Sequence, residues 1–195
     1  GKLQCKCNYP KLIRKGILIL NIKEQKGMNQ WEKMDKTIKL EKLDLMVAEK
    51  TPPSQKKYNL KVFKEISSYI TTKNRKWLLD IASGRGALMK YLLSQSNVKE
   101  KVKNIICTDL SPTIMLYDKK KFQELSNSVR INYIACDATN LPFQENSIDT
   151  NVSFFGFSNM GLKFPGALEE TYRVMKSKGL FLNSTLFIKK SSIGF

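Results

Sequence analysis

The carboxyl-terminal two thirds of the chain alternates short apolar runs with segments of helical spacing. The runs WLLDI, NIICTD, INYIACD, IDTNVSFF and GLFLNSTLF are rich in β-branched and aromatic residues, which is typical of strands. They predict strands that begin near Trp77, Asn104, Arg130, Ile148 and Gly179. Helical segments such as ALMKYLLSQ lie between them. This alternation predicts an α/β fold with a doubly wound, mainly parallel sheet that carries helices on both faces.

The preceding part of the chain has helical periodicity without strands. Apolar residues recur at helical intervals from Asn29 to Glu49, and the prolines of TPPS interrupt the pattern. A second apolar stripe predicts another amphipathic helix over 57–72. We therefore expect a helical cap over 29–73, followed by a domain over 74–195. Residues 1–28 contain only one apolar run. Two alternatives remain for them: the remnant of a ribbon with a β-hairpin, or a loose tail.

Three carboxylates each close one of the first three predicted strands: Asp80, Asp109 and Asp137. The carboxyl ends of parallel strands share one edge of a sheet, and ligands bind beyond that edge where the strand order reverses. Directly after Asp80, the glycines Gly84 and Gly86 allow a ligand to approach the main chain. The pattern predicts a ligand crevice that is lined by carboxylates.

A nicotinamide dinucleotide fits this glycine turn poorly. The dinucleotide pattern needs a third small residue after its two glycines, and the sequence GRGALM places Met89 there. A carboxylate at the end of the first strand would also repel the pyrophosphate. Asp80 instead suits a cationic or hydroxyl-rich ligand.

Four segments carry a resemblance to a known family. In order, LLDIASGRGAL, ICTDLSPTIM, ACDATNLPFQENSIDTNVSFFGFSNM and ALEETYRVMKSKGLFL resemble successive motifs of the class I S-adenosylmethionine-dependent methyltransferases, which have a Rossmann-like fold. The resemblance covers about residues 74–187. It points to the type 11 branch, which includes quinone-biosynthesis C-methyltransferases. It implies an enzyme that transfers a methyl group from S-adenosyl-L-methionine to a small-molecule acceptor, with S-adenosyl-L-homocysteine as product.

The resemblance also assigns residues to the cofactor. The turn from Ala82 to Gly86 would pass beneath the ribose and the methionine portion, with Asp80 close by. Asp109 would accept hydrogen bonds from the two ribose hydroxyls. Leu110 and Met115 would pack on the adenine ring.

The remaining implied contacts follow the third and fourth strands. Asp137 would accept from the adenine amino group, and Ala138 would offer a backbone N–H to the ring. Ser153 and Phe154 would support the methionine end. No catalytic residue is assigned, because a sulfonium methyl is already activated and its transfer depends mainly on alignment.

Charge and length leave alternatives open. The chain carries a formal charge of +17, and residues 1–76 hold 19 basic against 7 acidic residues, which is compatible with an RNA methyltransferase that uses a basic amino-terminal region. Against this, 29 of the 34 basic residues are lysine, whereas base and phosphate recognition favours arginine. The family's sheet usually continues beyond the fifth strand, so we expect a domain that is incomplete at its carboxyl end. A noncatalytic scaffold is the third alternative.

The cysteines and the apolar runs suggest the compartment. Cys5 and Cys7 faintly resemble one knuckle of a zinc ribbon, but without histidine or a second nearby pair the sequence predicts no metal site. Cys107 and Cys136 lie in apolar runs and are expected to be buried thiols. No run approaches the roughly 20 apolar residues that span a bilayer, and no signal peptide is recognisable. The expectation is a cytoplasmic protein.

Overall fold

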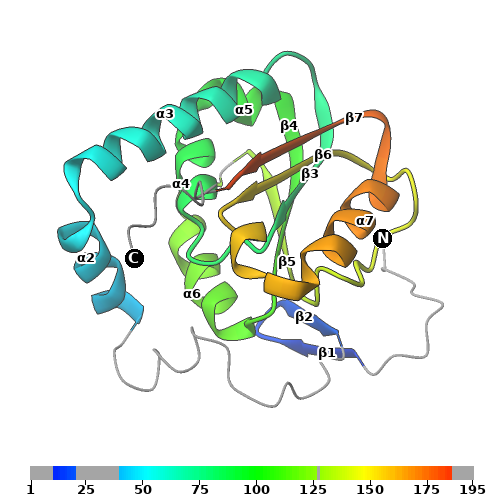
Figure 1. Cartoon of the computed structure of the whole chain (residues 1–195), viewed down its shortest axis with the longest axis horizontal. Helices are drawn as coiled ribbons and strands as arrows, with labels where there is room; N and C mark the ends of the chain where they lie inside the picture. Colours follow the sequence, from blue (N-terminus) through cyan, green and yellow to red (C-terminus); the bar gives the residue numbers. More distant parts are fainter. Residues whose placement is uncertain (1–10, 21–39, 127, 186–195) are drawn as a thin grey trace, which may run out of the picture.

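A computed structural model describes residues 11–20, 40–126 and 128–185, and these residues form a seven-stranded sheet with helices on both faces (Figure 1). The strands are β1 Lys11–Arg14, β2 Ile17–Leu20, β3 Arg75–Ile81, β4 Val102–Asp109, β5 Arg130–Ala135, β6 Ile148–Phe154 and β7 Met175–Ser184. Their order across the sheet is β1-β2-β5-β4-β3-β6-β7. Every neighbouring pair is parallel except the β1–β2 hairpin. The predicted α/β, Rossmann-like architecture is confirmed.

The helices follow the predicted stripes with shifted ends. They are α2 Leu40–Lys50, α3 Pro53–Ile70, α4 Ala87–Ser94, α5 Ser96–Lys101, α6 Pro112–Phe122 and α7 Phe164–Val174, with 3-10 turns η1 Phe157–Asn159 and η2 Gly161–Lys163. Helix α3 starts four residues before its predicted start, because Pro53 occupies the first turn, where a missing N–H costs nothing. The first part of the helix predicted over 29–49 lies outside the described residues. Within the described part of the chain, no helix is long and apolar enough to cross a membrane.

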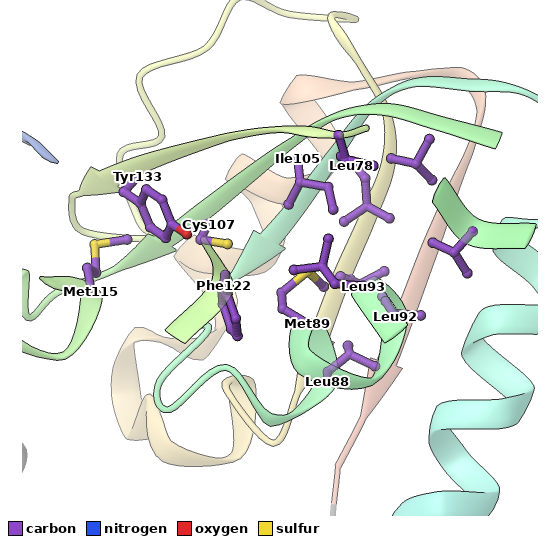
Figure 2. Close-up of a cluster of buried hydrophobic side chains, with 14 of the residues drawn as sticks. Leu78, Leu88, Met89, Leu92, Leu93, Ile105, Cys107, Met115, Phe122 and Tyr133 are labelled. Carbon is purple, nitrogen blue, oxygen red and sulfur yellow. The ribbon is translucent and has the colours of Figure 1, made fainter. Parts of the chain in front are cut away.

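Alternating side chains of the central strands form a separate core on each face of the sheet. Leu78 and Ile105 lie in the core that includes α3, α4, α5 and α6, whereas their chain neighbours Leu79 and Ile106 lie in the core that includes α7. Figure 2 shows the first core, with the leucines of α4 beneath the strands and Phe122 from α6 beside them. Because both faces are covered, the strands read as nearly continuous apolar runs.

Two edges of the sheet differ from the predicted outline. Strand β7 begins at Met175, four residues before the predicted Gly179, and its pairing with β6 shifts register between Ile148 and Thr150. At the other edge, β2 pairs in parallel with β5, and Ile17 is fully buried. The hairpin therefore adds to the same sheet as the residues beyond position 74. The zinc knuckle considered for Cys5 and Cys7 lies outside the described residues.

A buried arginine joins α3 to the first central strand. Arg75 begins β3 and is only 4% exposed. Its guanidinium donates to the carbonyl oxygens of Tyr69 and Ile70 and to the Thr72 hydroxyl, at 3.3–3.4 Å. These carbonyls belong to the last turn of α3, where helical partners are missing and the helix dipole favours a cation. Arg75 therefore fixes the direction in which the chain leaves the cap and enters the sheet.

Replacing this arginine should destabilise the whole domain. In Arg75→Met the apolar stem remains, but the carbonyls at the end of α3 lose a charged donor, so we expect the free energy of unfolding to fall by about 1–3 kcal/mol. Urea unfolding followed by circular dichroism measures the change. The matched control is Lys76→Met, an exposed neighbour that should stay within about 0.5 kcal/mol of the parent. Equal stability of the two variants would contradict this role of Arg75.

Candidate cofactor site

The candidate site lies where the strand order reverses. Strand β3 is central, and the chain proceeds from it to β4 on one side and later to β6 on the other. Asp80 and Asp109 lie at the carboxyl ends of the adjacent strands β3 and β4, and Asp137 follows β5. The parallel register therefore brings the first two predicted carboxylates to one edge of the sheet, at the position where α/β sheets bind ligands.

The turn after β3 has a left-handed backbone at three residues. The φ angles are 54° at Ala82, 55° at Gly84 and 62° at Gly86. A Cβ atom on Gly86 would lie 2.3 Å from the Phe122 ring and 2.9 Å from an Asp118 carboxylate oxygen, so the start of α4 packs directly on α6. The second glycine is thus required by contact as well as by conformation. The third small residue of the dinucleotide pattern is absent, and Met89 is instead fully buried in the core.

Asp109 holds the turn against the end of β4. One of its carboxylate oxygens accepts from the Gly84 amide and the other from the Ser111 amide, each at 2.9 Å. The side chain is 8% exposed. A carboxylate oxygen has two acceptor positions, so a group that holds two backbone donors can also accept from ligand hydroxyls. This geometry fits the predicted ribose contact, which stays a prediction.

Asp80 is a buried carboxyl group beneath the turn. It is 1% exposed, and its Oδ1 atom has no hydrogen-bond partner among the described residues. Burial raises the pKa of Asp80 well above its usual range, and the neighbouring carboxyl groups of Asp118 and Asp109 raise it further. An unsatisfied buried acceptor is costly. A cationic ligand close to the turn would relieve that cost, so the residues present fit a sulfonium or ammonium group.

Asp118 is a third buried carboxyl group, which the sequence analysis did not identify. It lies on α6, is 1% exposed, and has a carboxylate oxygen 3.2 Å from Lys121 Nζ. Burial raises the pKa of Asp118 to about 8, although Lys121 acts in the opposite direction. Its spacing of four residues from the buried Ile114 and Phe122 was a signal for this position. Three lysines follow it directly, and charged residues are mostly exposed, so its burial was not expected from the sequence.

The outer part of the site differs from the central part in burial and charge. Asp137 accepts from the backbone amide and the hydroxyl of Thr139 and forms an ion pair with the half-exposed Lys163. Although partial burial opposes them, these donors lower the pKa of Asp137. Ala138 is partly buried beside the second core. An adenine amino group would therefore meet an ionised carboxylate that already has two side-chain donors.

The remaining predicted contacts are placed unequally. Leu110 is partly exposed at the end of β4, whereas Met115 has no exposed surface and packs in the first core with Tyr133 (Figure 2). Contact between Met115 and an adenine ring would thus require its side chain to move. Ser153 is fully buried and donates to the Ile81 carbonyl at 2.8 Å, which ties β6 to the end of β3. These assignments stay predictions.

Phe154 belongs to an aromatic group at the end of β6. Its ring centroid lies 4.7 Å from that of Phe63 on α3 and 4.3 Å from that of Phe155. Phe63 in turn lies 5.6 Å from Tyr91 on α4. Helix α3 therefore packs over the β6 side of the site, on the strand that neighbours β3.

A separate hollow of about 300 Å³ lies between α3 and the edge strand β7. Its lining includes Tyr58, Tyr69, Leu182 and the buried Ser184, whose hydroxyl has no partner among the described residues. Strand β6 separates β7 from the glycine turn. The hollow therefore belongs to the outer side of the sheet, whereas the carboxyl groups gather around β3 and β4.

The mainly parallel sheet, the glycine turn after its central strand and the carboxylate that closes the next strand define a class I S-adenosylmethionine-dependent methyltransferase fold. A family model described as a methyltransferase domain matches residues 79–183, more than half of the chain. The chain belongs to this methyltransferase family, whose cofactor is S-adenosyl-L-methionine. The resemblance inferred from the four sequence motifs is confirmed.

Curated relatives share the central part of the chain. The ubiquinone/menaquinone biosynthesis C-methyltransferase UbiE of Rickettsia typhi is 31% identical over 105 residues, which are 54% of this chain and 42% of that protein. The corresponding protein of Dinoroseobacter shibae is 31% identical over 102 residues, which are 52% of this chain and 39% of that protein. The match thus spans less than half the length of these relatives.

Solved structures share the fold at low identity. The YcgJ protein of Bacillus subtilis superposes with a TM-score of 0.52 at 21% identity, over 62% of this chain and 49% of that chain. The [4+2]-cyclase SpnF superposes with a TM-score of 0.53 at 20% identity, over 62% of this chain and 42% of that chain. Because a cyclase shares it, the fold alone does not define the reaction.

The buried Asp118 should make stability depend on pH. An unfolded aspartate titrates near about 3.9, whereas folded Asp118 titrates near about 8, so the folded state binds more protons between these values. Stability is therefore highest at the acidic end of this window and falls as pH rises through it. Asp118→Asn removes this contribution. At pH 8 we expect the variant to exceed the parent by roughly 1–3 kcal/mol in urea unfolding, with little difference near pH 5.

Asp149→Asn provides a control of opposite sign. The pKa of Asp149 is lowered, despite partial burial, by its contacts with Lys176 and the Trp77 amide. Its contribution is present at neutral pH and is lost as the carboxylate is protonated in acid. This variant should therefore be less stable than the parent at pH 8. A gain in stability for Asp149→Asn, or none for Asp118→Asn, would contradict the charge distribution described here.

Proposed function

We propose that this chain binds S-adenosyl-L-methionine at the carboxyl ends of β3 and β4 and transfers its methyl group to a small-molecule acceptor. One observation carries the proposal: Asp109 is anchored by the Gly84 and Ser111 amides at the point where the strand order reverses. Its carboxylate is thereby held in one orientation before any ligand arrives. Because the side chain is already oriented, less conformational entropy is lost when the ligand binds.

Three elements would hold the cofactor. Asp109 would accept from the ribose hydroxyls, and the turn from Ala82 to Gly86 would provide a backbone surface. Asp80 would lie beneath the positive end of the cofactor, which would favour the ionised form of this buried carboxyl group. The bound sulfonium supplies an already activated methyl group. The protein then has to orient the acceptor in line with that group and exclude water.

The charge of the site favours this cofactor over a dinucleotide. Asp80, Asp109 and Asp118 are all at least nine-tenths buried, and the pKa of Asp80 is raised by burial and by both of its neighbours. A pyrophosphate would add like charge to this group, whereas a sulfonium offsets it. Methyl transfer converts the sulfonium to a neutral thioether. The electrostatic attraction between the carboxyl groups and the cofactor is then lost, which favours release of the product.

A flat, apolar acceptor fits the β6 side of the site. The curated relatives are named C-methyltransferases of ubiquinone and menaquinone biosynthesis. In this chain the aromatic group of Phe63, Tyr91, Phe154 and Phe155 lies at the end of β6, next to the strand that carries Asp80. Aromatic faces favour stacking with a planar ring. These observations support a quinone-like or phenolic ring as acceptor, and they give no preference to RNA.

Calorimetry with S-adenosyl-L-homocysteine, S-adenosyl-L-methionine and NAD tests the cofactor assignment. The parent should bind both sulfur ligands and prefer them to NAD. Asp109→Ala removes both acceptor oxygens, so we expect a loss of about 2–4 kcal/mol, or roughly 30- to 1,000-fold in affinity. Asp109→Asn keeps the shape and one acceptor oxygen and should lose less.

The control replaces a carboxylate at the opposite end of the sheet. Glu145 is exposed and precedes β6, so Glu145→Gln should bind S-adenosyl-L-homocysteine like the parent. A parent that binds NAD more tightly would refute the cofactor assignment. Equal affinity of Asp109→Ala and the parent would refute the proposed role of Asp109.

A further inference from the structure

Helix α2 reaches the glycine turn through one carboxylate. Asp44 on α2 accepts from Arg85 at 3.0 Å through one oxygen. Its other oxygen accepts from the Tyr117 hydroxyl at 3.0 Å and from Lys121 Nζ at 3.2 Å. Arg85 lies between the two glycines of the turn, whereas Tyr117 and Lys121 lie on α6. Asp44 therefore connects three segments that are distant in sequence.

The same contacts hold Arg85 at both ends. Its guanidinium is bound by Asp44, and its backbone carbonyl accepts from Lys121 Nζ at 2.8 Å. Lys121 also forms the ion pair with the buried Asp118. The residue between the glycines is thus fixed through both its side chain and its main chain. The sequence analysis gave no role to Arg85, because its partner lies 41 positions earlier in the chain.

Apolar packing places α2 so that this contact forms. Leu43, next to Asp44, is 2% exposed and lies in the first core, and Val47 packs against the same core one turn later. The donors around Asp44 lower its pKa although partial burial opposes them, so the group is ionised at neutral pH. The Asp44 side chain is 32% exposed, which limits the strength of each ion pair. Together, the contacts of Asp44 fix the position of the glycine turn relative to α2 and α6.

We propose that Asp44 is a positioning residue of the cofactor site, and that docking of α2 and binding of the cofactor are coupled through Arg85. This inference rests on the proposed function. The left-handed backbone of Ala82 is sparsely populated in a flexible chain, and Gly84 and Gly86 can each adopt many other conformations. Holding Arg85 restricts the turn to the conformation in which its backbone faces the ligand. By reciprocity, a ligand that requires this conformation stabilises the docked α2.

Calorimetry with S-adenosyl-L-homocysteine on variants of Asp44, Glu49 and Arg85 tests the proposal. Asp44→Ala should bind roughly 5- to 20-fold more weakly than the parent, because the turn must then be ordered on binding. Asp44→Asn keeps two acceptor positions and should lose less. Glu49→Ala, which changes an exposed acidic residue of the same helix, should stay within about twofold of the parent. If Arg85 transmits the effect, Asp44→Ala should weaken binding little further in an Arg85→Ala background.

Hydrogen exchange separates coupling from a merely structural role. In the parent, the ligand should slow amide exchange in α2, and in Asp44→Ala this slowing should disappear. If Asp44→Ala does not fold, Asp44→Asn and Arg85→Ala replace it in both measurements. Unchanged affinity in these folded variants, or α2 exchange that the ligand does not alter in the parent, overturns the inference. A parent that fails to bind the ligand refutes the proposed function instead.

Discussion

The hydrogen bond from the Gly84 amide to the Asp109 carboxylate is the constraint on which the rest of the site depends. It links the turn after β3 to the end of β4, and the Ser111 amide holds the same carboxylate from the start of α6. Both strands are buried on two faces, so their ends cannot move independently of the core. The site is therefore as rigid as the sheet that carries it. Loops alone would not give this precision.

The central site combines this rigidity with unfavourable charge. Three carboxyl groups share a poorly solvated region, and the pKa values of Asp80 and Asp118 are raised as a result. Replacing one of these carboxyl groups with a neutral residue would relieve the repulsion between them. A sequence that keeps such an unfavourable interaction is typical of a binding site, which is not optimised for stability. The apolar cores on both faces offset the cost. Under the proposed function, a positive ligand would offset the cost of ionising these carboxyl groups.

The strand pattern could be predicted from sequence because each strand repeats one simple rule. Successive residues such as Leu78 and Leu79 enter different cores, and Asp80 and Asp109 are found at the positions where the apolar runs end. The contact between Asp44 and Arg85 could not be found in this way. It joins residues 41 positions apart, and each alone looks like an ordinary surface charge. The early start of β7 was also missed, because its first residues pair across an irregular register.

The pairing of β2 with β5 has a consequence for how the protein folds. Leu18 lies beside Ile134, so the two strands meet only after a loop of more than a hundred residues has closed. The turn of the hairpin is also held from α6, where Lys119 donates to the Lys15 carbonyl at 2.7 Å. The entropy lost in closing this loop is not offset by contacts until β4, β5 and α6 are already in place. The hairpin is therefore synthesised before the other described strands but joins the sheet late, and until then the edge of β5 stays open to pairing with other chains.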